Sequence, residues 1–128
     1  MTSCAPRLAA ACLLLSVAAL PIRLFADQQT ENLIEGAHWK RAKAVVEKRL
    51  QANPNDPSAN YDLLRVEMAF ENLEQAARAG ERAIELNDAN ADYHAQLATV
   101  YANQAERAAV LKQVLLVHKM HREIEAAL

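Results

Sequence analysis

The chain has 128 residues and is short of several residue types, and each shortage excludes a class of structure. Its two cysteines, Cys4 and Cys12, both lie near the N-terminus, so no disulfide is expected in the remainder of the chain. Glycine occurs only 2 times and aromatic residues make up 5%, whereas alanine and leucine are abundant. This composition favours helices over a sheet, so we expect an all-α fold that is stabilised by packing alone.

Catalytic motifs are also missing. After Ala26 the sequence contains no Gly-rich phosphate loop, no Ser-x-Gly elbow and no cysteine nucleophile. The carboxylate pairs Glu71 with Glu74 and Asp88 with Asp92 are of a kind that is common at helix ends, and they do not make an acid–base site by themselves. We therefore predict that the protein is not an enzyme and has no cofactor.

The segment from Met1 to Ala26 has the features of a secretory signal peptide. Arg7 precedes an uncharged apolar run from Leu8 to Leu20, and Pro21 ends that run ahead of a polar segment. The run is shorter than the roughly 20 residues of a transmembrane helix. We predict a signal peptide over 1–26 with cleavage after Ala26 and a periplasmic or secreted product. An uncleaved segment that anchors the protein to a membrane is the alternative.

Charge limits the partners of the exported product. The residues after Ala26 contain 12 basic and 16 acidic side chains, which gives a net charge of −4. A nucleic-acid-binding domain normally carries a basic patch and a high isoelectric point. Nucleic acid is therefore not expected as a partner.

Two similar sequence segments recur in the chain at a regular interval. LQANPNDPSANYDLL ends one helical pattern and starts another, and ELNDANADYHAQL does the same. A shift of 34 places Ala42 on Ala76, Leu50 on Ile84, Asn53 on Asn87, Pro54 on Asp88, Leu63 on Leu97 and Leu64 on Ala98. In the middle unit one stripe of apolar residues ends at Phe70 and the next begins at Leu73. Only Glu71 and Asn72 separate them, so the two helices that carry these stripes must be antiparallel. We predict one repeat domain over 27–128 with units of about 27–56, 57–90 and 91–128.

The period and several residues resemble the tetratricopeptide repeat family, whose pattern reads W-x2-L-G-x2-Y, then A-x3-F, then proline. The residues at the pattern positions include His94, Leu97, Ala98 and Tyr101 in the third unit, Leu63, Ala76 and Gly80 in the second, and Ala42, Val46 and Pro54 in the first. The resemblance implies antiparallel helix pairs stacked as a short right-handed solenoid. It also implies that Trp39, at the turn before its helix, packs in the core.

The sequence departs from the family pattern in both later units. Leu64 stands where the family has a small residue, and Gly80 stands where it has an aromatic one. No glycine or proline occurs from residue 102 onward, so we expect an elongated C-terminal helix or an inserted turn after Tyr101. In that register Ile124 takes the aromatic position and Ala127 the small one.

The resemblance implies a protein–protein interaction scaffold, because the family binds peptides in the groove lined by the first helix of each pair. The face that would line this groove holds acidic residues beside Arg65, so we do not expect the clamp with which some members bind a terminal carboxylate. The residues expected to contact a protein or peptide partner are Ser58, Tyr61, Arg65, Met68, Ala95, Thr99 and Asn103.

The C-terminal segment carries one apolar stripe where a terminal helix would normally be polar. The stripe consists of Val110, Val114, Val117, Ile124 and Leu128. It can be covered by folding back, by a partner or by a second copy of the chain. We predict a weak homodimer through this segment. A chain that is the N-terminal piece of a longer array is an alternative.

The alternative function from another class is binding of a metal or a small ligand. His118, His121 and Glu125 fall at spacings that place them on one helical face, as zinc ligands often are. A tetrahedral site needs a fourth ligand, and the sequence indicates none. We therefore predict no metal ligand.

Overall fold

The computed structural model describes the backbone of residues 19–128, with side chains from Phe25 onward except that of Ala26. This part of the chain forms six α-helices and no strand, as predicted. The helices are α1 (Ala19–Glu35), α2 (Trp39–Ala52), α3 (Pro57–Ala69), α4 (Leu73–Leu86), α5 (Ala91–Glu106) and α6 (Val110–Ala127).

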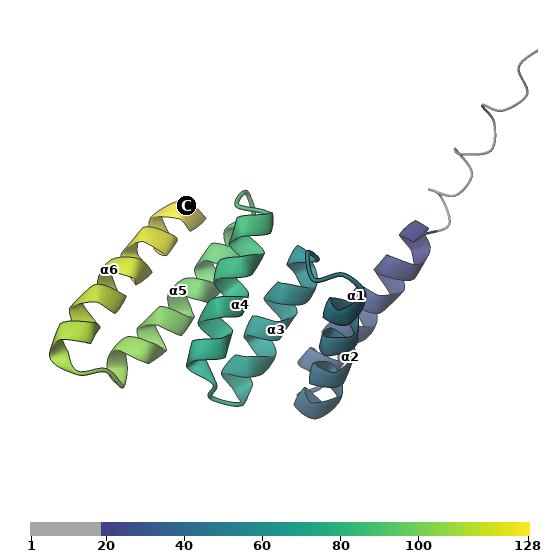
Figure 1. Ribbon diagram of the computed structural model, residues 1–128, viewed down its shortest axis with the longest axis horizontal. Coiled ribbons are helices and arrows are strands. Elements are labelled where there is room, and N and C mark those ends of the chain that lie inside the picture. The colour runs from purple at the N-terminus through teal and green to yellow at the C-terminus, as the bar shows by residue number, and fades with distance from the viewer. Residues whose placement is uncertain (1–18) are drawn as a thin grey trace, which may run out of the picture.

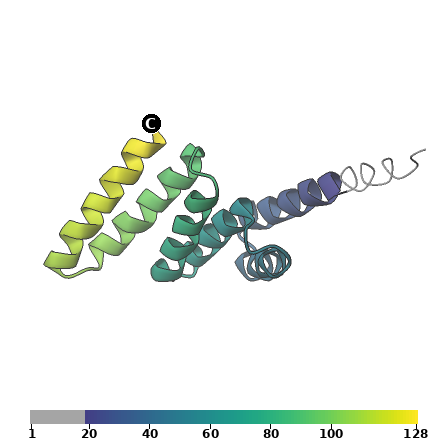
Figure 2. The same ribbon diagram turned by 45° about the horizontal axis from the view of Figure 1, so that its top comes forward.

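The helices stand in a row, with α1 and α2 at one end and α6 at the other (Figures 1 and 2). Consecutive helices contact each other along the row, and α1, α3 and α5 also make contacts from one pair to the next. This is a solenoid of stacked helix pairs, so the predicted all-α repeat fold is confirmed.

The first two helix pairs use the same tight turn. Ala37 has φ 54° and Glu71 has φ 61°, a left-handed conformation that non-glycine residues rarely adopt. In both turns the next residue, His38 or Asn72, donates its backbone N–H to a carbonyl five residues earlier. This is the Schellman pattern of a helix C-terminus. The second turn follows the first by the same shift that aligns the sequence repeats, so the sequence period is also a period of the backbone.

Side-chain caps start the first helices of the second and third pairs. Asp56 accepts a hydrogen bond from the backbone N–H of Ala59 at 3.1 Å, and Pro57 follows at the first helical position. Asn90 accepts a hydrogen bond from the backbone N–H of Asp92 at 3.0 Å. Asp92 itself lies in the first turn of α5.

Leu64 and Gly80, the two departures from the family pattern, compensate for each other. Leu64 is fully buried on α3, and a Cβ added to Gly80 on α4 would lie 2.5 Å from Leu64 Cδ1 and 3.0 Å from Leu97 Cδ1. The large side chain on α3 therefore fills the space that the glycine leaves on α4. Close packing is kept although the sizes at the two positions are exchanged.

The third pair contains the expected interruption but a different register. α5 has 16 residues, a turn over Arg107–Ala109 follows, and α6 has 18 residues. The side chains that α6 turns toward the core are Leu116, Met120 and Glu123. Ile124 is 41% exposed, so its predicted aromatic position is wrong, and the half-buried Met120 takes the position that corresponds to Gly80. The polar Glu123 is buried because His94 binds it, which apolar spacing alone does not predict.

The proposed cleavage position, Ala26, lies within α1. Cleavage there would leave Asp27–Glu35 as the first helix of the array. Most of the predicted signal peptide lies outside the described residues, so export stays a prediction. Within residues 19–128 no helix has the length and apolar character needed to cross a membrane.

Candidate interaction surfaces

The first helices of the three pairs, α1, α3 and α5, line one side of the row. Equivalent positions of these helices are Asp27, Tyr61 and Ala95, and one turn later Glu31, Arg65 and Thr99. We call this surface the inner face. A hollow of about 290 Å³ opens on it between α1 and α3, and its lining residues are Asp27, Gln28, Glu31, Ser58, Tyr61 and Asp62.

Arg65, one of the predicted partner-binding residues, is already paired within the chain. Its two terminal nitrogens donate to the two carboxylate oxygens of Glu31 at 2.6 and 3.0 Å. The same guanidinium lies 5.7 Å from the ring centre of Tyr61, which stacks on Tyr93 at 4.7 Å. This bidentate pair fixes α1 against α3. Arg65 therefore helps to shape the inner face and is not a free cation on it.

Arg49 on α2 joins three helices behind the hollow. Its guanidinium donates to Asp27 of α1, to Asp62 of α3 at 2.7 Å and to Asp56 at 3.2 Å, and it also reaches the hydroxyl of Ser58 at 3.3 Å. Its side chain is only 10% exposed. Three carboxylates around one buried arginine leave an excess of negative charge at this point.

Asp62 is the buried carboxyl of this cluster. Burial raises its pKa to about 6, and the nearby guanidinium groups of Arg49 and Arg65 offset only part of that effect. The hollow therefore becomes more negative as the pH rises through 6. A cationic group is the ligand that this charge distribution favours.

The remaining predicted residues also lie along the inner face. Ala95 and Thr99 are exposed on α5, and Asn103 is half-buried further along the same helix. Met68 is half-buried, and its sulfur accepts a hydrogen bond from Gln96 at 3.3 Å. All seven predicted residues thus come from α3 and α5. Whether they bind a partner stays a prediction.

Sequence reasoning missed Asp27 and Glu31. Each lies one repeat period before a residue that was selected, Tyr61 or Arg65. Extending the repeat by one period toward the N-terminus would have identified them. No sequence pattern indicated the role of Arg49, because its partners are spread over α1, α3 and the turn before α3.

A buried ion pair joins α5 to α6. His94 Nδ1 lies 2.7 Å from Glu123 Oε2, and His94 Nε2 lies 2.9 Å from the carbonyl oxygen of Asp88. Burial lowers the pKa of His94, but the bonds to Glu123 and Asp88 raise it more, and the net shift is upward. Burial raises the pKa of Glu123, but His94 and Arg122 lower it more. Both shifts favour a charged imidazolium–carboxylate pair.

The outer side of α6 is apolar. Val110, Val114, Val117, Ile124 and Leu128, which we call the α6 stripe, are between 37% and 101% exposed. Leu111 and Leu115 beside them are also exposed. The described chain therefore does not fold back over these side chains. Soluble monomers rarely expose a large contiguous apolar patch, and such a patch usually marks a contact site.

His118, His121 and Glu125 are all exposed on α6. No group of three His, Cys, Asp or Glu residues within the described chain is arranged to hold a metal ion. His94 and Glu123, which do lie together, are occupied by each other.

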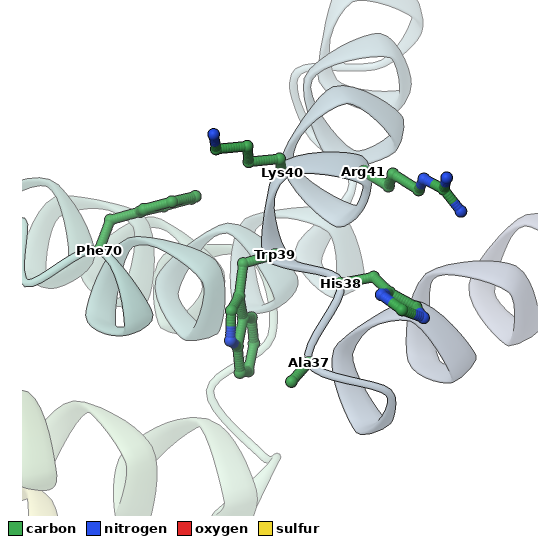
Figure 3. Close-up of a pocket in the computed structure, with 6 residues that line it drawn as sticks. All are labelled: Ala37, His38, Trp39, Lys40, Arg41 and Phe70. Carbon is green, nitrogen blue, oxygen red and sulfur yellow. The ribbon is translucent and has the colours of Figure 1, made fainter.

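Trp39 packs, as predicted, beside the cluster of Ile34, Ala42 and Val66, together with Phe70. An open hollow of about 450 Å³ lies over it (Figure 3). Lys40 and Arg41 at the rim point to opposite sides of α2 in that view, so they do not converge on one ligand. This hollow is a shallow gap between α2 and the end of α3.

Comparison with known proteins gives one kind of match. No protein-family model matches the chain, and no curated protein matches it. The chain is similar to the solved structure described as "MamA RS-1 ArsTM double mutant", with a TM-score of 0.65 and 21% sequence identity. The match covers 79% of this chain and 53% of the solved chain. This chain therefore spans about half of the length of the solved protein. The likeness shows the fold. It supports a tetratricopeptide-like repeat, as the sequence resemblance implies.

Proposed function

We propose that this protein is an exported, non-enzymatic scaffold that binds a protein or peptide along the inner face. The observation that carries the proposal is the continuous surface made by equivalent positions of α1, α3 and α5, with a hollow between α1 and α3. Helical-repeat proteins use such extended surfaces for binding. The acidic cluster at Asp27, Glu31 and Asp62 favours a segment with a lysine or arginine side chain.

A photo-cross-linking amino acid at Thr99 tests this surface, because Thr99 is exposed on α5 and its hydroxyl bonds only to its own helix. The same group at Arg82 is the matched control, since Arg82 is exposed on α4, away from the inner face. We expect a discrete cross-linked partner from Thr99 and none from Arg82. Equal labelling from both positions would contradict the proposal.

Export is tested by the mass of the protein recovered from the envelope of the native cell. We expect a chain that begins near Asp27, because the apolar run with its early arginine directs secretion and is then removed. A chain that still begins at Met1 would contradict cleavage and favour the membrane anchor.

We further propose that the protein self-associates through the α6 stripe. The stripe lies at one end of the row and no described helix covers it. Val117→Glu with Ile124→Glu should abolish association in sedimentation equilibrium and leave the helical circular dichroism unchanged, because both side chains are exposed in the monomer. A parent that stays monomeric at high concentration would contradict this part of the proposal.

A further inference from the structure

The two ends of the row differ in polarity. At the N-terminal end, the exposed side chains of α1 after Ala26 are Gln28, Gln29, Asn32 and Glu35, all of them polar. At the C-terminal end, the exposed side chains of α6 and its C-cap include seven aliphatic ones. A head-to-tail stack would place the polar face of α1 on the apolar face of α6. The apolar end of a second molecule is a better match.

The internal repeats show what covers the surface of α4 that corresponds to the α6 stripe. The core residues of α6, Leu116, Met120 and Glu123, follow Ala76, Gly80 and Ala83 of α4 by 40 positions. With the same offset, Val117, His121 and Ile124 correspond to Ala77, Glu81 and Ile84.

The face of α4 that carries Ala77, Glu81 and Ile84 is covered by α5, the next helix of the row. Tyr101 of α5 donates its hydroxyl proton to Glu81 at 2.6 Å, and Ala77 belongs to the same core cluster as Tyr101. The α6 stripe is thus the surface on which a further helix would stack.

The spacing of the stripe fits a partner helix that runs alongside α6. Val110, Val114, Val117, His121, Ile124 and Leu128 are separated by four, three, four, three and four residues. This alternation is the a/d pattern of a coiled coil. A stable interface buries about 800 Å² on each partner. The five aliphatic side chains of the α6 stripe, each at least 37% exposed, supply part of such an area.

The pattern is symmetric about Lys119, and this symmetry distinguishes the two directions of pairing. In an antiparallel pair Val114 meets Ile124 of the second copy, and Val117 meets His121. Small residues then face large ones along the whole contact. In a parallel pair each residue faces itself, so two His121 imidazoles would meet at the centre.

We propose that two copies of this chain pair through antiparallel α6 helices about a two-fold axis near Lys119, which leaves both inner faces free. This arrangement rests on the self-association proposed above and specifies its geometry. The result is a bivalent scaffold with two identical peptide-binding faces. A closed two-fold contact of this kind stops at the dimer.

Disulfide cross-linking of the full-length chain tests the direction, in a background that carries Cys4→Ser and Cys12→Ser. Two antiparallel copies of Val114→Cys would hold their new thiols about 15 Å apart along the helix. A disulfide requires Cα atoms within about 7 Å. We expect no covalent dimer from Val114→Cys alone, and a covalent dimer from a mixture of Val114→Cys with Ile124→Cys.

His121→Leu provides an independent measurement, because it replaces the one polar residue of the a/d line. We expect the dissociation constant of the dimer to fall by about tenfold or more, since each dimer gains two buried aliphatic side chains. His118→Leu is the control, because residue 118 lies beside the a/d line, and its effect should be smaller. An equal effect of the two substitutions would contradict the a/d register.

The outcomes separate the geometry from the self-association. A covalent dimer from Val114→Cys alone would overturn the antiparallel direction. A parent that is dimeric in sedimentation but forms no cross-link in the mixture would overturn the α6 geometry and leave self-association standing. A monomeric parent would overturn both and would favour a longer array or another protein as the cover of α6.

Discussion

The α3/α4 pair and the α5/α6 pair share one design and are held together in different ways. Between α3 and α4 the contact is apolar and close, with Leu64 lying against Gly80 and with Ala76 and Ala83 fully buried. Between α5 and α6 the contact includes the ion pair of His94 with Glu123, and the apolar side chains of α6 mostly face outward. The last pair therefore leaves an apolar surface exposed in the described chain.

The largest expected effect is the loss of Leu64. Leu64→Ala should lower the free energy of unfolding by about 4 kcal/mol, because Gly80 has no side chain that could fill the resulting cavity. Leu64→Ala with Gly80→Leu restores the sizes typical of the family and should recover part of this loss. Urea unfolding of the two variants measures both effects. A double variant less stable than Leu64→Ala would show that the two sites do not share one volume.

The ion pair of the last helix pair should come next. His94→Ala leaves Glu123 buried with only Arg122 as a partner, and we expect a loss of about 3 kcal/mol at pH 6. The folded pKa of His94 is raised, so its stabilisation is fully present below the unfolded pKa of about 6.5 and is lost as the pH rises through the folded value.

The difference in stability between the parent and His94→Ala should therefore shrink at alkaline pH. It should also shrink at acid pH, as the pH falls through the folded pKa of Glu123, which is lowered. Asp62 titrates in both proteins, so its contribution cancels in this difference. A difference that stays constant across the whole range from acid to alkaline pH would contradict a charged pair.

Ala76 tests how closely α4 approaches its neighbours. Ala76→Leu should lower the free energy of unfolding by about 2 kcal/mol, because the site is fully buried and has no room for a larger side chain. The equivalent residue of α6 is already leucine, Leu116, which shows that the last pair is spaced for a larger side chain. If the urea midpoints of Ala76→Leu and the parent coincide, the close approach is absent.

The smallest expected effect concerns the turn between α3 and α4. Glu71→Gly should raise the free energy of unfolding by about 0.5 kcal/mol, because glycine adopts the left-handed conformation of Glu71 without strain. The turn between α5 and α6 has no residue with positive φ, so Ala108→Gly should destabilise the protein instead. Thermal unfolding of both variants measures this contrast.

The sequence alone determined where two of the helices begin. Asp56, Pro57 and Asn90 specify helix starts through contacts with residues that are close in the chain, and such contacts depend little on the rest of the fold. The repeat period likewise located the helix pairs, because each pair repeats the same local pattern of apolar residues.

The tertiary structure decided which faces of the helices meet. The register of α6 is set by Leu116, Met120 and the pairing of Glu123 with His94 on another helix, whereas the family register had placed Ile124 at the aromatic position. The compensation of Leu64 by Gly80 and the pairing of Arg65 with Glu31 likewise join different helices. Local propensity does not encode such pairs, since each forms only after two helices have packed at one particular distance and angle.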